Sequence, residues 1–174
     1  MKVNTRLAAI AFGLMTSFAV SAANAQDLPN VRMIATGGTI AGAQASAGEY
    51  GYKSGTYDVD TLISAVPNLD KLADITGEQV VNIGSQDMND EVWLKLARSV
   101  AAAQADGDVD AIVIMHGTDT LEETSYFLSL VTQGTKPVVM VGSMRPATAV
   151  SADGPANIYN GVAVAINPEA EGKG

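Results

Sequence analysis

Residues 111–123 read AIVIMHGTDTLEE: five apolar residues, a glycine turn, and then the acidic start of a helix. A continuous apolar run, as opposed to an alternating one, is typical of a strand buried on both faces, as in a parallel sheet. Thr120 and Glu123 have the spacing of a capping box, which predicts a helix from about 120 to 131. The stretch therefore predicts a strand, a tight turn and a helix, which is the repeating unit of α/β folds.

Three other apolar runs share this pattern and end at glycine, and they cover residues 31–35, 80–83 and 138–141. Two more helices are expected between or after them, over residues 89–105 and from about 153 to 166. Strands that alternate with helices imply right-handed crossovers. The predicted fold class is therefore α/β, with an open, mostly parallel sheet and helices on both faces.

Residues 42–56 interrupt this alternation, because they hold Gly, Ala, Ser and Gln with little periodicity. Tyr50 and Tyr52 lie in this segment, and Tyr57 follows it. The pattern predicts a long mobile loop after the first strand, and loops of this length are usually functional or disordered.

The first 25 residues have the pattern of a secretory signal peptide, with basic Lys2 and Arg6 followed by an apolar run over residues 7–20. Small residues at 23 and 25 predict cleavage before Gln26. The alternative is a membrane helix, but this run of 14 residues is shorter than the roughly 20 that cross a bilayer. We expect export to a bacterial periplasm and a mature chain that begins at residue 26.

Composition excludes several classes of function. The formal net charge is −9, which makes nucleic acid and an anionic membrane surface poor partners. Cysteine is absent, so disulfides, thiol nucleophiles and thiolate metal sites are excluded. His116 is the single histidine, so a metal site with several histidines is excluded as well.

Each predicted strand ends in glycine with hydroxyl, amide or acidic neighbours. In open α/β sheets, ligands bind beyond the carboxyl ends of the strands. The four turns at this edge predict a site for a polar small molecule. The turns are residues 36–39, 84–87, 116–120 and 142–145.

Three familiar kinds of site fit these residues poorly. A catalytic triad would need His116, which follows a buried strand and is better interpreted as a hydrogen-bonded structural histidine. Asp106, Asp108 and Asp110 resemble half a calcium loop, but the glycine and terminal glutamate are misplaced, so we interpret them as a solvated turn. Residues 37–38 are not a phosphate loop, because no Gly-Lys-Ser/Thr follows. A hydroxyl nucleophile activated by neither cysteine nor histidine remains.

Residues 34–41, IATGGTIA, and 115–123, MHGTDTLEE, resemble the two signatures of bacterial L-asparaginases. Residues 84–88, 141–146 and 151–155 resemble further blocks of that family, and the resemblance covers about residues 28–167. With the signal peptide, it points to the secreted, type II branch, which includes glutaminase-asparaginases. It implies a flavodoxin-like or Rossmann-like N-terminal domain.

The resemblance also implies roles for individual residues. Thr39 matches the threonine that attacks the side-chain amide and becomes the acyl-enzyme. Tyr52 matches the tyrosine that lies over it and helps to move its proton, with Tyr50 as a close competitor. Thr118 matches a second threonine, which contacts substrate and joins a Thr–Lys–Asp set. Asp119 matches the carboxylate that binds the substrate α-ammonium group.

Ser85 and Gln86 match the residues that hold the α-carboxylate and α-amino groups of the substrate. The same resemblance implies no metal and no organic cofactor, an amino-acid substrate, and a homotetramer for the full-length family member. The activity implied is hydrolysis of L-asparagine to L-aspartate and ammonia, with L-glutamine as a second candidate substrate.

The sequence departs from the family pattern at two points. After Lys136 the only lysine is Lys173, so the lysine partner expected for Thr118 is missing. The family also completes each site with a glutamate from a neighbouring subunit's C-terminal domain, which this sequence lacks. Residues 26–174 are therefore expected to be an incomplete N-terminal asparaginase domain. The alternatives are a catalytically incompetent fragment that at most binds amino acids, and a flavodoxin-like nucleotide binder, which the acidic charge disfavours.

Overall fold

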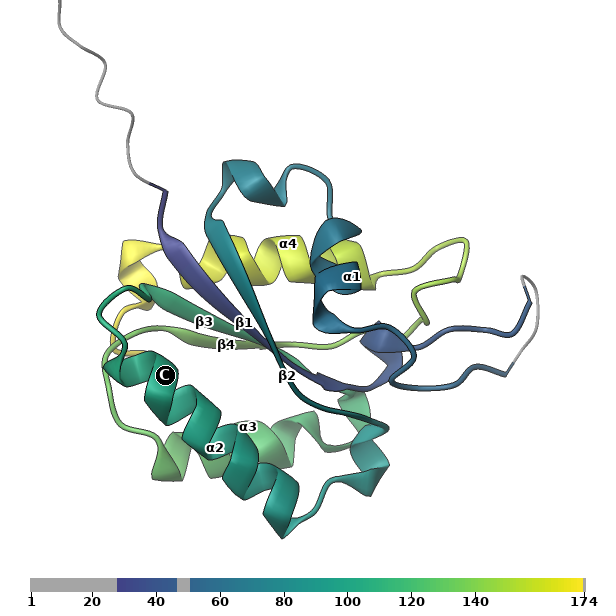
Figure 1. The fold of residues 1–174 in the computed structure, drawn as a ribbon, viewed down its shortest axis with the longest axis horizontal. Coiled ribbons are helices and arrows are strands. Elements are labelled where there is room, and N and C mark those ends of the chain that lie inside the picture. The colour runs from purple at the N-terminus through teal and green to yellow at the C-terminus, as the bar shows by residue number, and fades with distance from the viewer. Residues whose placement is uncertain (1–27, 47–50, 174) are drawn as a thin grey trace, which may run out of the picture.

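A computed structural model of the chain describes residues 28–46 and 51–173. The predicted signal peptide, residues 1–25, and the alternative tyrosine, Tyr50, lie outside the described residues. Four strands form one sheet in the order β2-β1-β3-β4, and every neighbouring pair is parallel (Figure 1). The strands are β1 (Asn30–Gly37), β2 (Asp74–Ile83), β3 (Ala111–Met115) and β4 (Val138–Val141). The predicted α/β class with a parallel sheet is confirmed.

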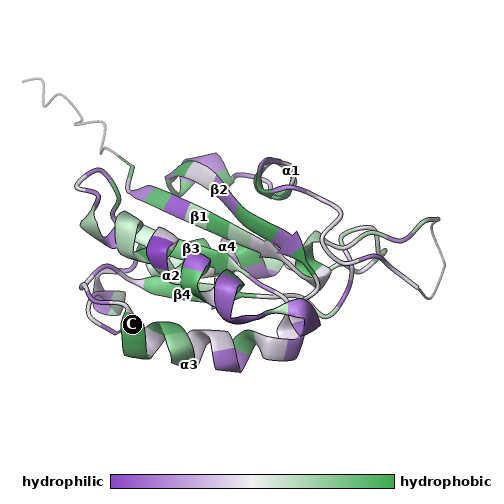
Figure 2. Ribbon diagram, turned by 60° about the horizontal axis from the view of Figure 1, so that its bottom comes forward, coloured by the Kyte–Doolittle hydropathy of each residue, from purple (hydrophilic) through white to green (hydrophobic). Residues whose placement is uncertain are grey.

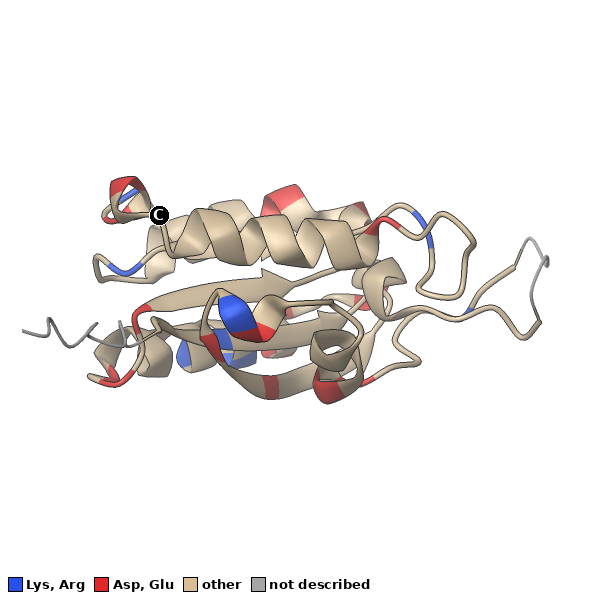
Figure 3. Ribbon diagram, turned by 90° about the horizontal axis from the view of Figure 1, so that it is seen from above, with Lys and Arg blue, Asp and Glu red and all other residues tan. Residues whose placement is uncertain are grey.

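Helices cover both faces of the sheet, as predicted. On one face, α1 (Val59–Ser64) and α4 (Gly154–Ala165) bury Val59, Leu62 and Val162 in the first hydrophobic core. On the other, α2 (Asp90–Ala105) and α3 (Leu121–Val131) bury Leu96 and Leu128 in the second. Figure 2 shows the mixed polar and apolar surfaces of α2 and α3 beside the apolar strands. Helix α4 contains no charged residue and is wholly tan in Figure 3.

Strand β2 begins six residues before the predicted run 80–83, at Asp74. Among the described strands it pairs with β1 alone and lies at the edge of the sheet, so residues 74–79 are mostly polar and half-exposed and lack a continuous apolar run. The short helix α1 was also not predicted. Its sequence signal is Asp58, whose carboxylate accepts a hydrogen bond from Thr61 N at 2.8 Å and caps the helix.

The capping box predicted at the start of α3 is wrong. The Thr120 side chain does not cap the helix, and its hydroxyl donates to the Ser85 carbonyl oxygen at 3.0 Å. A 3₁₀ turn over Thr118–Thr120 precedes α3. Thr120 therefore connects the turn after β3 to the turn after β2. Its hydroxyl bonds to the distant Ser85 carbonyl oxygen and not to a backbone amide of its own helix.

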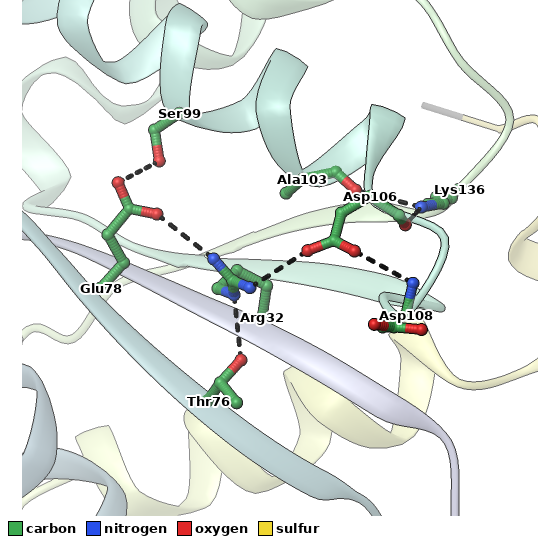
Figure 4. A network of polar contacts seen from close by, with 8 residues as sticks. All are labelled: Arg32, Thr76, Glu78, Ser99, Ala103, Asp106, Asp108 and Lys136. Carbon is green, nitrogen blue, oxygen red and sulfur yellow. Dashed lines mark hydrogen bonds and ion pairs between the residues drawn. The ribbon is translucent and has the colours of Figure 1, made fainter.

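An ionic network joins β1, β2 and the C-terminal end of α2 (Figure 4). The Arg32 guanidinium lies 3.7 Å from Glu78 Oε2 and 3.5 Å from Asp106 Oδ2, and its Nε donates to Thr76 Oγ1 at 2.9 Å. Lys136 Nζ donates to the carbonyl oxygens of Ala103 and Asp106 at the end of α2.

Residues 106–110 form a mostly exposed turn, as predicted, but two of its carboxylates also make contacts with β1. Asp106 pairs with Arg32 and also accepts a hydrogen bond from Asp108 N at 3.0 Å. Asp110 accepts a hydrogen bond from Asn30 N at 2.8 Å, across from the start of β1. Both carboxylates fasten this turn to the amino end of the sheet.

Replacing Arg32 with Met is expected to lower the free energy of unfolding by about 1 kcal/mol, because Glu78 and Asp106 lose their shared cation. These side chains are partly exposed, so the loss should shrink at high salt, where charges are screened. The measurement is urea unfolding at low and at high sodium chloride. Arg98→Met, at an exposed position of α2, is the control and should change stability by less than about 0.5 kcal/mol. A salt-independent loss would contradict an ionic origin.

Among residues 28–46 and 51–173, no helix has the length and apolar character needed to cross a bilayer.

Candidate active site

The carboxyl ends of β1, β2 and β3 meet at glycines. A Cβ built on Gly38 would lie 2.5 Å from Gly117 N, and one on Gly117 would lie 2.5 Å from Ser85 Oγ. Gly38 also has a φ of +81°, which an L side chain rarely adopts. Beside them, at the end of β4, a Cβ on Gly142 would lie 2.9 Å from Thr118 Cγ2. Because these glycines have no side chains, the four turns can pack closely at one edge of the sheet.

Thr39 lies in a 3₁₀ turn directly after β1, and its side chain faces Tyr52. The Thr39 Oγ1 and Tyr52 OH atoms are 2.6 Å apart and share a hydrogen bond in which either can donate. Thr39 is 8% exposed and Tyr52 is 43% exposed, so the hydroxyl is nearly covered while the phenol reaches solvent. The Tyr52 ring also packs over Gly42, where an added Cβ would lie 2.9 Å from Tyr52 Cδ2.

The described flanks of the loop predicted over residues 42–56 are anchored. Ala43 and Lys53 form an isolated antiparallel bridge with two backbone hydrogen bonds, of 3.0 and 2.9 Å. Gln44 N donates to Thr148 Oγ1 at 2.9 Å, and Ala147 N donates to the Gly42 carbonyl at 2.9 Å. The position of Tyr52 is therefore set by its neighbour Lys53, which is hydrogen-bonded to Ala43. Ala43 lies in the loop segment that follows Thr39.

A second pair of predicted site residues lies across the turns after β2 and β3. Asp119 N donates to Ser85 Oγ at 3.1 Å, while the Asp119 residue is exposed and Ser85 is buried. Gln86 is exposed, and its amide group lies over Gly84. Thr118 is half-buried at the same turn. Within the described ranges, no hydrogen bond joins the Thr39–Tyr52 pair to the Ser85–Asp119 pair.

His116 is a buried structural residue, as predicted. Its Nδ1 lies 2.7 Å from the Gly117 carbonyl oxygen and its Nε2 lies 3.0 Å from Thr124 Oγ1. Burial lowers the pKa of His116, against the opposing effects of the Gly117 hydrogen bond and the Glu123 charge. Both ring nitrogens are engaged inside the fold, so His116 is not available as a general base.

Asp153 was not identified from the sequence as a residue that organises the site. Its carboxylate accepts hydrogen bonds from Met144 N and Arg145 N, each at 2.9 Å, and from Asn157 Nδ2 at 3.2 Å. Burial would raise the pKa of Asp153, but these donors hold it below the ordinary value. The residue therefore fastens the turn after β4 to the start of α4. Its sequence signal was the block at 151–155.

Among the residues that the structure describes, no group of three or more His, Asp or Glu side chains is arranged to hold a metal ion.

Comparisons with known proteins agree on one family. The family model described as "Asparaginase, N-terminal" matches residues 30–174. The chain is 54% identical over 169 residues to "Probable L-asparaginase periplasmic" of Haemophilus influenzae, covering 97% of this chain and 48% of that protein. It is 54% identical over 148 residues to "Glutaminase-asparaginase" of Pseudomonas fluorescens, covering 84% of this chain and 41% of that protein.

A crystal structure titled as a probable cytoplasmic L-asparaginase from Campylobacter jejuni matches with a TM-score of 0.80 and 52% identity. That match covers 84% of this chain and 45% of the other. The chain thus spans about half the length, or less, of the relatives it matches. The Haemophilus relative is named periplasmic and the Campylobacter structure is titled cytoplasmic, so the names differ in compartment.

Proposed function

The chain belongs to the asparaginase family, and from this premise we propose that it supplies the nucleophile and the substrate-binding turns for hydrolysis of L-asparagine to L-aspartate and ammonia. The observation that carries the proposal is the 2.6 Å hydrogen bond between Thr39 Oγ1 and Tyr52 OH at the carboxyl end of β1. A threonine hydroxyl is a weak nucleophile on its own, so a group that can take its proton is needed beside it.

In the proposed reaction, Thr39 Oγ1 forms a bond to the side-chain carbonyl carbon of asparagine as Tyr52 helps to move the hydroxyl proton. The carbon–nitrogen bond then breaks, and the proton leaves with ammonia. A water molecule attacks the resulting threonine ester and releases L-aspartate, which restores the Thr39 hydroxyl. The nearly covered position of Thr39 favours this chemistry, because fewer water molecules hydrogen-bond to the nucleophile and weaken the electrostatic interactions around it.

The turns after β2 and β3 carry groups suited to an amino-acid zwitterion. The exposed Asp119 carboxylate can pair with the α-ammonium group, and Gln86 can hold the α-amino group as well. Ser85 Oγ already accepts the Asp119 N–H, and its own hydrogen has no acceptor among the described residues, so it can donate to the α-carboxylate. Thr118 contacts the substrate in this proposal.

The wider proposal follows the same resemblance. Residues 26–174 form an N-terminal domain of a homotetrameric enzyme, exported to the periplasm by the signal peptide of residues 1–25. The name of the Haemophilus relative supports the compartment. L-glutamine is the second candidate substrate, and the name of the Pseudomonas relative supports it.

A second candidate function is amino-acid binding without turnover. The observation that favours it is the position of Lys136, which is the last lysine before Lys173 and lies away from Thr118. Lys136 precedes β4 at the amino end of the sheet, and its Nζ is bonded to the carbonyl oxygens that end α2. It therefore cannot complete a Thr–Lys–Asp set at the opposite, carboxyl edge.

Two assays separate these functions. The first measures ammonia release from L-asparagine by the chain and by a chimera in which residues 30–174 replace the matching part of the Haemophilus relative. The second measures L-aspartate binding to the same proteins by calorimetry. Ammonia release by the chimera supports the amidohydrolase, and aspartate binding with no release from either protein supports the second function. Neither binding nor release would contradict both.

Replacing Tyr52 with Phe in the chimera is expected to lower kcat for asparagine by about 100-fold, the usual contribution of a positioned proton-transfer group. The KM should change by less than about threefold, because Ser85 and Asp119 remain in place. The measurement is steady-state ammonia release. Tyr57→Phe, which removes the hydroxyl of a ring packed against the first core, is the matched control. Equal kcat values for the two variants would exclude a role for the Tyr52 hydroxyl.

A further inference from the structure

Three buried or half-buried polar groups that the proposed reaction does not use form a continuous chain of hydrogen bonds. Trp93 Nε1, on α2, donates to Thr124 Oγ1, on α3, at 2.8 Å. Thr124 Oγ1 lies 3.0 Å from His116 Nε2, and His116 Nδ1 lies 2.7 Å from the Gly117 carbonyl oxygen. Thr124 and His116 are fully buried. The chain thus runs from the two helices to the turn that carries Thr118 and Asp119.

The partners fix the direction of every hydrogen bond. A carbonyl oxygen only accepts, so His116 Nδ1 carries the ring proton, and the indole of Trp93 only donates. Thr124 Oγ1 therefore accepts from Trp93 and donates its own hydrogen to the bare Nε2 of His116. Burial lowers the pKa of His116, which agrees with a neutral ring. Each donor and acceptor in the chain is satisfied in this single arrangement.

We infer that Trp93, Thr124 and His116 form a relay that positions Thr118. The Gly117 carbonyl belongs to the peptide bond that leads into Thr118, so holding this oxygen fixes the plane from which Thr118 projects. Among the described residues, His116 is the one whose side chain hydrogen-bonds to this carbonyl oxygen. The inference rests on the proposed function for the role of Thr118, and the three relay residues are positioning residues because none of them touches substrate.

The next residues of the turn are held by a different set of contacts. Asp119 N donates to Ser85 Oγ, and the Thr120 hydroxyl donates to the Ser85 carbonyl oxygen. The relay is therefore expected to act on Thr118, while Ser85 and Asp119 keep their arrangement without it. If the relay positions Thr118, its loss should affect Thr118 more than Asp119. If it only adds stability, its loss should affect both residues equally.

Trp93 itself is held between the two helices. Its ring packs against Phe127 of α3, with ring centroids 6.1 Å apart. The relay therefore begins at a side chain that is fixed by packing, which makes it a rigid anchor for the turn.

The experiment uses the whole chain labelled with ¹⁵N, in which His116 and Trp93 are the only histidine and tryptophan and give unambiguous signals. Thr124→Val keeps the shape of the side chain and removes the hydroxyl. Thr124→Ser is a separate variant that keeps a hydroxyl. Ser125→Ala is the control, because within residues 28–46 and 51–173 the Ser125 hydroxyl bonds only to the Glu122 carbonyl oxygen on the same helix. The measurements are the His116 tautomer and amide hydrogen exchange at Thr118 and Asp119.

We expect the unchanged chain to hold the Nδ1–H tautomer. In Thr124→Val, both tautomers should be populated, and amide exchange should accelerate about tenfold at Thr118 but less than about twofold at Asp119. Thr124→Ser and Ser125→Ala should behave as the unchanged chain. An Nε2–H tautomer in the unchanged chain would overturn the inference, and so would unaltered exchange at Thr118. Equal acceleration at both amides would also overturn it, because the hydroxyl would then serve general stability.

Calorimetry with L-aspartate completes the test. Thr124→Val should weaken L-aspartate binding by about threefold, because Thr118 contacts the ligand in the proposal while Ser85 and Asp119 are held separately. A loss larger than tenfold would overturn the assignment to Thr118. If the unchanged chain binds no L-aspartate, the proposed function fails, while the tautomer and exchange results still decide whether the relay exists.

Discussion

Replacing Thr39 with Ala in the chimera is expected to lower kcat for asparagine by at least about 1,000-fold, because removal of a nucleophile costs several orders of magnitude in turnover. The affinity for L-aspartate should stay within about threefold, since the proposed binding groups at Ser85 and Asp119 come from other turns. Steady-state ammonia release and calorimetry on the same sample give the two quantities.

The structure makes Thr39 a clean site for this test. Among the residues that the structure describes, its side-chain hydroxyl has one hydrogen-bond partner, Tyr52 OH, and Tyr52 is exposed enough for water to replace the lost partner. The variant should therefore fold as the unchanged protein does. Thr39→Ser is the control, because it keeps a hydroxyl at the same position and should retain measurable turnover. If Thr39→Ala kept a tenth of the original kcat, another group would be the nucleophile.

Replacing Gly38 with Ala is expected to lower the free energy of unfolding by about 3 kcal/mol or more. The new Cβ would lie 2.5 Å from Gly117 N, a clash with backbone that costs about 1–3 kcal/mol when a packed interior is overfilled. The φ of +81° adds about 1–2 kcal/mol, because L side chains are strained there. Relief of the clash would push the turns after β1 and β3 apart, so ligand binding should weaken as well.

Urea unfolding of the chain measures this loss. Gly107→Ala is the matched control, because an added Cβ meets nothing within 4 Å at that position. We expect that variant to be neutral or slightly stabilising, since alanine has less freedom in the unfolded chain. A loss below about 1 kcal/mol for Gly38→Ala would mean that the strand ends can separate without strain, and that the close approach of the turns is not needed for folding.

The parts of the fold that were predicted correctly share a strong local signal. Strand β3 is apolar along its whole length because both faces are covered, and α2 begins with two acidic residues next to its positive end. Strand β2 was predicted at less than half its length, since an edge strand needs no continuous apolar run. Thr120 was misjudged because its partner, the Ser85 carbonyl, is 35 residues away in sequence.

Some features of the candidate site also had a strong local signal in the sequence, and others had none. The position of the polar turns at one edge follows from parallel strands and could be predicted from apolar runs and glycines. The pairing of Thr39 with Tyr52 had no local signal and depended on the resemblance. The contact between Trp93 and Thr124 could not be predicted at all, because the two residues lie on separate helices whose relative position only the folded sheet determines.

The Arg32 network lies at the amino end of the sheet, whereas Thr39 follows β1 at its carboxyl end. The seven residue-to-residue steps from Arg32 to Thr39 span at most roughly 23 Å of extended chain, and free-energy changes at positions so far apart usually add. Protein engineers can therefore improve thermal tolerance at residues 32, 78 and 106 and alter the proposed site at the opposite edge as two independent design problems. Libraries at the two ends can be screened separately and their best variants combined in one chain.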